Sequence, residues 1–398
     1  MTSRWWKSGR ERMAIVNGLE ITNLLGGLME ISWQQSIMVL AGLLLIYLGI
    51  AKEYEPMLLI PIGFGCVLGN LPVAAHMIGP DGLFGVMKKA GIDNELFPLL
   101  IFLGVGTMLD MRPLLSLPVM FVMGALAHLG IFATLIVSIL MGFNLAEATA
   151  IGMIGAIDGP TVIYVNGKLQ DLFQTPGLAA AIAVTAYSYM SLVPIIQPPL
   201  MRMFTTKKER MIRMAYTPRP VSKKVVIAFP LIITALGGIF LPQAAPLIAT
   251  LMLGNLMRES AVVDGLVKTA KEAITNTATI FLGLVIGSSM QAEFFLSGAT
   301  IKILLLGLVA FALNTIGGLL FGKLLCLLSR GRINPLVGAA AISAFPMSGR
   351  LAQKIAFEDD QQNFILMHAL GANVAGQVAS VLAAGILIQM VFPLLLSK

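Results

Sequence analysis

Charged residues are scarce in this sequence. Of its 398 residues, 12% are Asp, Glu, Lys or Arg, whereas 57% are hydrophobic. Because soluble globular proteins carry about 25% charged residues, this composition excludes a water-soluble domain. Several segments without any charged residue reach or exceed the roughly 20 residues that a helix needs to cross a bilayer. These segments are residues 113–146, 172–201, 225–257, 273–292, 303–322 and 361–397. The sequence therefore predicts an all-α polytopic membrane protein.

Cysteine and histidine are also rare. The two cysteines, Cys66 and Cys326, lie in apolar segments without a CxxC motif or a neighbouring histidine. This pattern excludes a disulfide framework and a Cys/His metal centre. The Walker A, Rossmann, HExxH and GxSxG motifs are missing as well, so nucleotide hydrolysis by this chain is not expected.

The basic residues that are present cluster in one polar loop. The formal net charge is +7, and eight of the 27 Lys and Arg residues fall between Arg202 and Lys224, opposed only by Glu209. The positive-inside rule places this loop, residues 201–224, in the cytoplasm. No aromatic residues alternate with its charges, which argues against a nucleic-acid partner. Residues 1–30 are basic and contain two tryptophans near the start, which is typical of an interfacial segment.

The chain contains an internal similarity. Residues 61–71 reappear as residues 246–256, with five identities in eleven positions at an offset of 185. Ile101-Phe-Leu-Gly104 returns as Ile280-Phe-Leu-Gly283, and Ile157 aligns with Ile342, again at an offset of 185. The matches keep their order, which predicts two membrane repeats, residues 31–200 and 225–398, joined by the basic loop. Chance similarity among apolar helices is the alternative.

Each predicted repeat contains one segment in which Gly and Pro interrupt an apolar run. These segments are Gly152 to Pro160 and Asn334 to Gly349. Pro removes a backbone donor and Gly tolerates unwound backbone, so both segments are expected to break as helices. Broken helices at corresponding positions in two halves indicate a transport site, because freed carbonyls and helix ends bind small ions.

Asp158 is the most informative single residue. It lies between apolar residues, and the nearest basic residue along the chain is Lys168. An ionisable group at membrane depth is costly and indicates an ion or proton path. The alternative is that Asp158 caps a helix in an interfacial turn. With Asp158, the oxygen atoms of Thr161, Asn334 and Ser343 are hard donors of the kind that Na+ prefers.

A second group of polar residues lies in the other half. Arg350 is always charged and binds carboxylates through two parallel hydrogen bonds, although a cation at a membrane boundary is equally expected at this position. Asn373 and Tyr189 lie at nearly equivalent places in the two halves. Their alternatives are helix–helix hydrogen bonding for Asn373 and interfacial anchoring for Tyr189. The three histidines are isolated and are expected to be structural.

Several motifs together resemble one family. They are Glu55 to Gly65, Asp158-Gly-Pro-Thr161, Ala186-Tyr-Ser-Tyr-Met190 with Gln197-Pro-Pro199, Asn334 to Arg350, and Leu366-Met-His368 with Asn373-Val-Ala-Gly376. From about Tyr47 to Pro393 the sequence resembles the β subunits of sodium-pumping biotin-dependent decarboxylases, which act on oxaloacetate, methylmalonyl-CoA, glutaconyl-CoA or malonate. It departs from the family at Ser348-Gly349 and Gly371-Ala372. These departures remove no polar ligand, but they leave the soluble substrate open.

The resemblance implies a fold and a set of functional residues. The fold is two inverted repeats with broken helices, forming a scaffold and a mobile core in the inner membrane with roughly 10–11 transmembrane segments. The implied Na+ ligands are Asp158, Asn334, Gly338, Ser343 and Asn373. Asp158, Tyr189 and Arg350 are the implied catalytic residues, and Arg350 is expected to bind carboxybiotin.

The resemblance also implies a reaction and partners. The β subunit decarboxylates carboxybiotin, consumes a proton and moves Na+ outward. The implied partners are an α carboxyltransferase subunit, a small γ membrane subunit, a biotin carrier, membrane lipid and further copies of this chain. The alternative function is a secondary transporter, either a sodium-coupled carboxylate symporter or a cation antiporter, which would share the repeats and broken helices.

Overall fold

The computed structural model describes residues 31–396 apart from residue 73 and residues 216–219. Within these residues the chain forms helices and no strand, which confirms the all-α prediction. The predicted interfacial segment, residues 1–30, lies outside the described residues.

The first half contains α2 to α13. Their bounds are α2 Trp33–Ala51, α3 Pro56–Gly69, α4 Ala74–Ile78, α5 Leu83–Gly91, α6 Leu96–Met108, α7 Arg112–Ser116, α8 Val119–Ala127, α9 Leu129–Leu140, α10 Leu145–Met153, α11 Gly159–Leu169, α12 Leu178–Met203 and α13 Lys207–Arg210. The second half contains α14 Lys223–Phe240, α15 Ala245–Ser260, α16 Asp264–Thr269, α17 Thr275–Ser288, α18 Ala292–Phe295, α19 Gly298–Leu328, α20 Leu336–Ala339, α21 Met347–Asp359 and α22 Leu366–Leu396.

Several of these helices are long enough to span a bilayer. Among the described residues, six are sufficiently long and apolar, and a seventh span results if the bent pair His76–Gly91 and Leu96–Met108, which meet at 53°, is taken as one. The six are Trp33–Ala51, Val119–Leu140, Leu178–Met203, Lys223–Phe240, Gly298–Leu328 and Leu366–Val391. The structure therefore confirms a polytopic membrane protein. The larger number of predicted segments stays a prediction, because helices such as Pro56–Gly69 are apolar but short.

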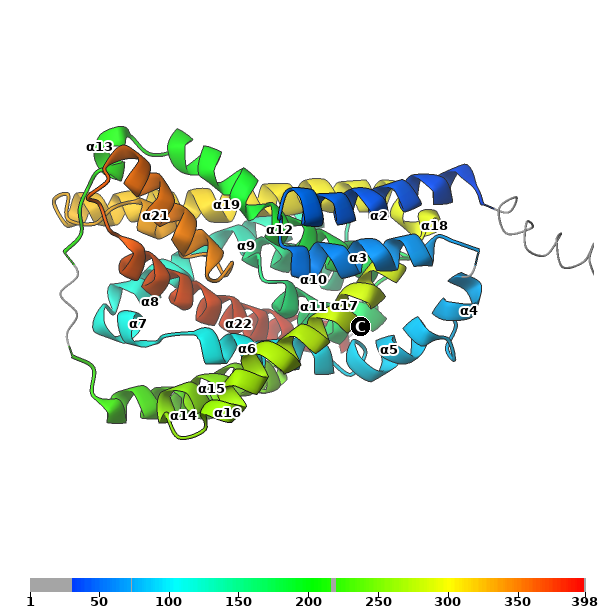
Figure 1. The fold of residues 1–398 in the computed structure, drawn as a ribbon, viewed down its shortest axis with the longest axis horizontal. Coiled ribbons are helices and arrows are strands. Elements are labelled where there is room, and N and C mark those ends of the chain that lie inside the picture. Colours follow the sequence, from blue (N-terminus) through cyan, green and yellow to red (C-terminus); the bar gives the residue numbers. More distant parts are fainter. Residues whose placement is uncertain (1–30, 73, 216–219, 397–398) are drawn as a thin grey trace, which may run out of the picture.

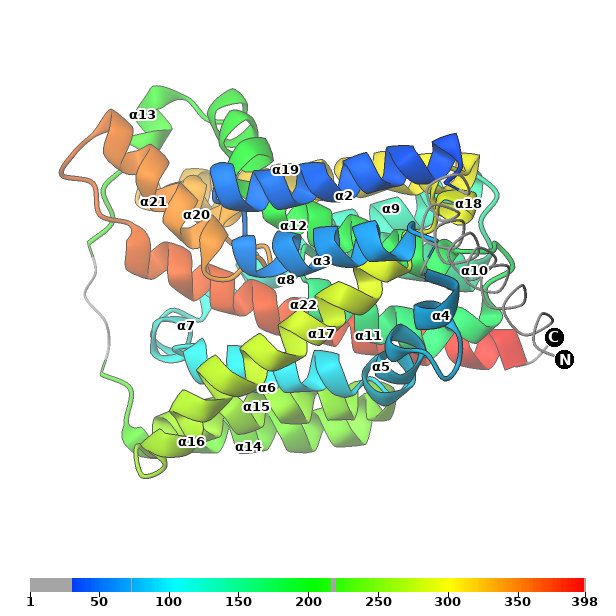
Figure 2. The same ribbon diagram turned by 45° about the vertical axis from the view of Figure 1, so that its right-hand side comes forward.

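The helices pack into two groups, and each half of the chain contributes to both. The first group contains α2, α3, α6, α14, α15 and α17, and the second contains α8 to α12 and α19 to α22. In Figures 1 and 2, α14 and α15 lie along the lower edge, α19 lies near the top, and α22 runs through the middle. One end of the molecule contains α13 and α21, and the opposite end contains α5 and α18.

Within the first group, helices of one half pack against helices of the other half, and the same pairing occurs twice. Helix α3 packs against α17, and α15 packs against α6. The Nδ2 atom of Asn70 donates to the Met290 carbonyl at 2.8 Å, and that of Asn255 donates to the Leu109 carbonyl at 2.8 Å. Asn70 and Asn255 are equivalent in the sequence alignment of the halves, so the same hydrogen bond recurs at paired positions. The inverted relation of the halves stays a prediction.

Glycines permit this close packing. A Cβ atom at Gly287 would lie 2.0 Å from the Ile62 carbonyl oxygen, and one at Gly254 would lie 2.1 Å from the Leu103 carbonyl oxygen. Small residues allow helix backbones to approach each other in membranes, where packing replaces the hydrophobic effect as the driving force.

Replacing Gly254 by Val should destabilise the first group of helices. The new side chain meets backbone atoms of α6 that have no room to move, and overpacking of this kind costs about 1–3 kcal/mol. Thermal unfolding of the purified protein in detergent measures the effect. Gly238→Val is the matched control, because a Cβ atom at Gly238 in α14 meets nothing within 4 Å. Equal unfolding temperatures for the two variants would contradict the tight α6–α15 contact.

Both predicted broken segments are interrupted in the structure. Helix α10 ends at Met153 and continues as a 3-10 turn, Ile154–Ala156, before Ile157 adopts a left-handed conformation with φ of 58°. Helix α11 then begins at Gly159. In the second half, α20 ends at Ala339 and α21 begins at Met347. The intervening residues carry the polar groups that the sequence pointed to.

Candidate functional site

Asp158 is buried at the start of α11. It is 5% exposed, and its carboxylate accepts four hydrogen bonds. The Oδ1 atom accepts from the Thr161 backbone N–H at 3.5 Å, while Oδ2 accepts from the Thr161 hydroxyl at 2.5 Å. Oδ2 also accepts from Gln377 Nε2 at 2.7 Å and from Ser380 Oγ at 3.1 Å. Asp158 thus caps α11 and is also buried among polar partners from α22.

No cationic side chain of the described residues forms an ion pair with Asp158. A buried carboxylate is costly unless an opposite charge or a metal ion compensates it. The hydrogen bonds from Thr161, Gln377 and Ser380 orient the carboxylate without supplying that charge. This arrangement is suited to a mobile cation.

The sequence alone does not identify Gln377 and Ser380 as residues of the site. They follow Asn373 on α22 at spacings of four and seven residues, which places all three on one face of the helix. This spacing was the available signal. Each residue alone is an ordinary polar residue in an apolar helix, and only the fold brings it to Asp158.

The two broken segments pack against each other close to this carboxylate. Ile157 of the first break and Ile342 of the second belong to one buried cluster with Val193, Phe311 and Ala344. The two breaks therefore lie close together in the core. Unwound backbone inside a membrane protein is tolerated where protein groups satisfy it or where it lines a cavity.

Two buried asparagines bind carbonyls of these breaks. Asn373 on α22 donates from Nδ2 to the Ile342 carbonyl at 2.6 Å, and Asn314 on α19 donates from Nδ2 to the Gly155 carbonyl. Within the described part of the chain, the Oδ1 atoms of both asparagines are buried and accept no hydrogen bond. The Asn314 Oδ1 lies against Gly130 of α9, where a Cβ atom would be 2.2 Å from it, so no contact places this oxygen beside Asp158. The sequence pointed to Asn373 but not to Asn314.

Ser343 lies in the second break and connects it to two other helices. Its Oγ lies 3.0 Å from the Gly376 carbonyl of α22 and 2.9 Å from Nε2 of His128, which lies between α8 and α9. The Nδ1 atom of His128 is 2.7 Å from the Gly124 carbonyl. His128 thus is not isolated, because it contacts the predicted ligand Ser343.

The two tyrosines of α12 differ in their surroundings. The Tyr189 hydroxyl donates to the Leu304 carbonyl at 2.5 Å, and its ring packs beside Gly307 on α19. The Tyr187 ring packs against Gly159, where a Cβ atom would lie 2.6 Å from the ring. The Tyr187 hydroxyl is buried and has no hydrogen-bond partner among the described residues. Tyr187, which the sequence did not single out, is thus the one next to Asp158.

Asn334 lies at the end of the molecule that carries the basic loop. Its Nδ2 donates to the carbonyls of Arg210 and Ile212, each at 2.9 Å, and its Oδ1 accepts from the Leu336 N–H at 3.0 Å. These contacts hold the loop after α13, and none of them joins Asn334 to Asp158. Its role as a Na+ ligand stays a prediction.

Gly338 and Arg350 complete the predicted set. Gly338 allows α20 to approach α19, because a Cβ atom there would lie 2.0 Å from the Gly318 carbonyl oxygen. Arg350 on α21 is exposed. Its guanidinium forms no ion pair within the described residues, in contrast to Arg202, Arg210 and Arg213.

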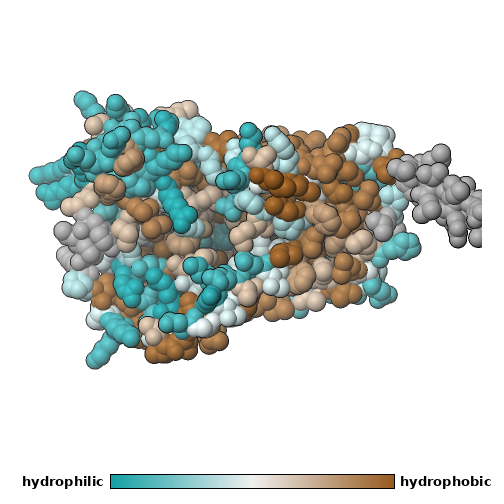
Figure 3. Space-filling view, viewed as in Figure 1, coloured by the Kyte–Doolittle hydropathy of each residue, from teal (hydrophilic) through white to brown (hydrophobic). Residues whose placement is uncertain are grey.

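The basic loop is fixed to the end of α21 by ion pairs. Arg210 pairs with Asp359 at 2.5 Å, Arg213 pairs with Asp360 at 2.6 Å, and Arg202 pairs with Glu358. The hydrogen bonds from Arg213 lower the pKa of the Asp360 carboxyl. Figure 3 shows that polar side chains gather at this end, whereas the rest of the visible face is mainly apolar.

Comparisons with known proteins agree with the resemblance. Residues 34–391 match the family described as Na+-transporting oxaloacetate decarboxylase beta subunit. The chain is 49% identical to the methylmalonyl-CoA decarboxylase subunit beta of Veillonella parvula, over 92% of this chain and 95% of that protein. It is 47% identical to the glutaconyl-CoA decarboxylase subunit beta of Acidaminococcus fermentans, over 92% and 95%. It is 42% identical to the oxaloacetate decarboxylase beta chain of Klebsiella pneumoniae, over 95% and 98%. These relatives favour the decarboxylase prediction over the secondary transporter.

Proposed function

This chain belongs to the family of Na+-transporting oxaloacetate decarboxylase β subunits, and we propose that it decarboxylates carboxybiotin while it moves Na+ out of the cell. It is a multi-pass membrane subunit of a decarboxylase. The relatives are named for different soluble substrates, so the acid or CoA thioester stays open.

Asp158 carries the proposal for the ion site. We place Na+ beside its carboxylate, where the unpaired Oδ1 of Asn373, on the same face of α22 as Gln377 and Ser380, supplies a further oxygen ligand. Na+ is a hard cation and prefers oxygen donors. Its charge compensates the buried carboxylate, which lacks an ionic partner within the described chain. Ser343, positioned by His128, and Asn334 with Gly338 complete this site or form a second one.

The proton links the ion to the reaction. A cation near an acid favours the charged form of that acid, so Na+ entry beside Asp158 favours release of a proton from Asp158 itself. Tyr189 is the second candidate for this proton, although its hydroxyl donates to the Leu304 carbonyl. Decarboxylation of carboxybiotin breaks the bond between nitrogen and the carboxyl carbon, releases CO2 and places a proton on the biotin nitrogen. In this proposal, the proton released at the ion site is the proton that the biotin nitrogen takes up during decarboxylation.

Arg350 is proposed to attract the carboxylate of carboxybiotin from the cytoplasmic side. Its exposed guanidinium lies on α21, the helix that is joined to the basic loop. The positive-inside rule places that loop in the cytoplasm. A guanidinium without a competing acidic partner is free to bind a carboxylate through two parallel hydrogen bonds.

The family implies an α carboxyltransferase subunit and a biotin carrier as partners. We further propose that a small γ subunit and additional copies of this chain complete the assembly. The two halves are proposed to be inverted repeats. In this mechanism the first helix group is the scaffold, and the second group, which holds Asp158 and both breaks, is the mobile core.

Na+ uptake into inverted membrane vesicles tests the proposal. With the copurified complex in the vesicles, one of the candidate acids or CoA thioesters should drive accumulation of radioactive Na+ in the lumen. Avidin, which sequesters biotin, should stop both decarboxylation and uptake. Na+ uptake that avidin does not affect would favour the secondary transporter, and avidin-sensitive decarboxylation without Na+ accumulation would refute coupling.

A further inference from the structure

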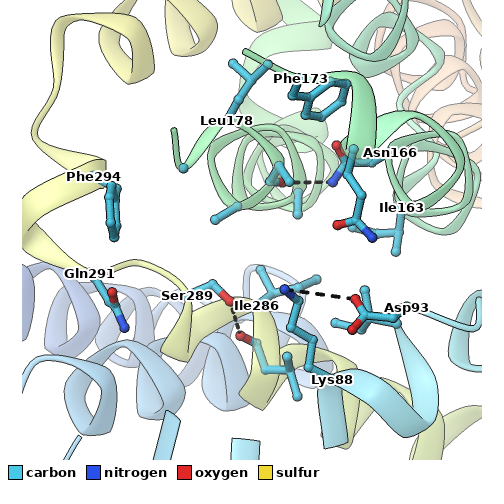
Figure 4. Close-up of a pocket in the computed structure, with 18 of the residues that line it drawn as sticks. Lys88, Asp93, Ile163, Asn166, Phe173, Leu178, Ile286, Ser289, Gln291 and Phe294 are labelled. Atoms are coloured by element: carbon cyan, nitrogen blue, oxygen red, sulfur yellow. Dashed lines mark hydrogen bonds and ion pairs between the residues drawn. The ribbon is translucent and has the colours of Figure 1, made fainter. Parts of the chain in front are cut away.

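A large cavity opens at the end of the molecule opposite the basic loop. Its volume is about 750 Å³, and it lies between α5 and α17 on one side and α11 with the start of α12 on the other. Figure 4 shows Lys88, Asp93 and Ser289 on the first side and Asn166 and Phe173 on the second. Because the basic loop marks the cytoplasm, this cavity faces the outer side of the membrane.

The cavity approaches the ion site along two helices. Its inner wall includes Ile163 of α11 and Ala183 of α12. Gly159 and Tyr187 each lie four residues from these positions, a helical distance of about 6 Å. The Tyr187 ring packs on Gly159, directly after Asp158. One turn of each helix therefore separates the cavity from the carboxylate.

Apolar side chains form a barrier between the cavity and Asp158. Ile163, Ala183 and Tyr187 belong to one buried cluster with Ile286, and the exposed fractions of Ile163 and Tyr187 are 2% and 1%. The barrier is formed by α11 and α12 of the second helix group against α17 of the first. Movement of one group relative to the other would open it.

Asn166 lines the cavity on the outer side of this barrier. It is 6% exposed, and its Nδ2 donates to the Ala179 carbonyl at 2.9 Å. Its Oδ1 is buried and has no hydrogen-bond partner in the described part of the molecule. Gln170 lies one turn further along the cavity wall. An amide oxygen binds Na+ more weakly than a carboxylate does, which suits a position from which the ion leaves.

The fixed charges of the cavity allow a cation to pass. Lys88 lies 3.9 Å from Asp93, so the positive charge in the wall has an acidic neighbour. Asp171 adds a further exposed carboxylate near the mouth. The wall therefore carries more acidic than basic side chains, together with neutral amides that replace water around an ion.

We propose that this cavity is the outer vestibule through which Na+ leaves Asp158, and that Asn166 is the first ligand that the departing ion meets. The barrier of Ile163, Ala183 and Tyr187 separates the two positions until the helix groups move. This inference rests on the proposed function, because it takes Na+ at Asp158 as its starting point.

Modification of a single cysteine in the vestibule tests the path. In a Cys326→Ser background, Ser289→Cys is treated in right-side-out vesicles with a cationic thiol reagent that does not cross membranes. Inverted vesicles prepared afterwards should show Na+ uptake reduced by about tenfold, since a fixed positive charge in a narrow passage repels a cation. External Na+ should slow the modification. Gly298→Cys is the control, because it lies near the same end in open space outside the cavity wall.

A second variant tests the ligand. Asn166→Leu should lower the maximal rate of Na+ transport by about tenfold, the effect of losing one polar contact, without changing the cytoplasmic Na+ concentration for half-maximal rate. Asn166→Gln, which retains the amide, should recover part of the rate. A Leu variant with normal transport would overturn the role of Asn166.

The outcomes separate this inference from the proposed function. If modified Ser289→Cys transports Na+ normally, the vestibule is refuted, while the Na+ dependence of decarboxylation at Asp158 is unaffected. If Ser289→Cys is modified only from the cytoplasmic side, the assignment of the outer face is refuted. The result does not depend on how Asn166 variants fold, because the modified protein is already assembled.

Discussion

Replacing Asp158 by Asn should abolish Na+-stimulated decarboxylation, with a loss of more than about 100-fold. The change keeps the size of the side chain but removes the negative charge, and losing one partner of a buried ion pair costs about 3–5 kcal/mol. An amide also places an N–H group where the carboxylate accepts hydrogen bonds from Gln377 and Ser380. Both effects weaken Na+ binding. The measurement is the rate of CO2 release by the purified complex as a function of Na+ concentration.

The control for this prediction is Asp264→Asn. Asp264 is exposed at the start of α16, so the same chemical change there should leave the Na+ dependence unchanged. Size-exclusion chromatography of both variants with the partner subunits establishes that insertion and assembly are intact. Na+-stimulated turnover retained by Asp158→Asn would remove the central residue from the mechanism.

The site at Asp158 was predictable because the cost of burying its carboxylate can be judged from the neighbouring residues in the sequence. A carboxylate between apolar residues stands out in any sequence, and the adjacent Gly and Pro predict the interruption that the structure contains. Asn314 was not predictable in the same way. It is a single amide in an apolar helix, a pattern typical of ordinary helix–helix hydrogen bonding. Its contact with Gly155 joins positions 159 residues apart, and such contacts depend on the assembled fold.

The fold was predictable at the level of membrane segments. Charge-free runs coincide with α12, α19 and α22, where one long helix fills the run. The run at residues 225–257 instead contains α14 and α15, because Pro242 starts a new turn between them. Absence of charge identifies residues that enter the membrane. It does not locate the turns within a run.

The sequence predicts the two halves of the chain, but it does not predict how the helices group in space. The sequence suggests two consecutive repeats, residues 31–200 and 225–398, and that division stays a prediction. In the structure the packing units mix the halves, since α3 lies against α17 and α6 against α15. This exchange depends on glycines such as Gly254 and Gly287, whose contacts appear only when both helices are placed.

Replacing Arg350 by Ala should raise the concentration of carboxylated biotin carrier needed for half-maximal decarboxylation by about 10- to 100-fold. This range follows from the loss of a charge-assisted hydrogen bond, about 1.5–3 kcal/mol. The Na+ concentration for half-maximal rate should stay the same, because Arg350 is on α21 and makes no described contact with Asp158. Arg350→Lys keeps the charge but loses the two parallel bonds, so an intermediate effect is expected.

Lys354→Ala is the matched control for this result. Lys354 lies one helical turn from Arg350 on the same helix and is also exposed, so its removal takes the same charge from nearly the same place. A general loss of positive charge at the cytoplasmic end would affect both variants equally. A specific carboxylate site would affect only Arg350→Ala. Equal and small changes would show that Arg350 is a cation at the membrane boundary, the alternative that its sequence position had left open.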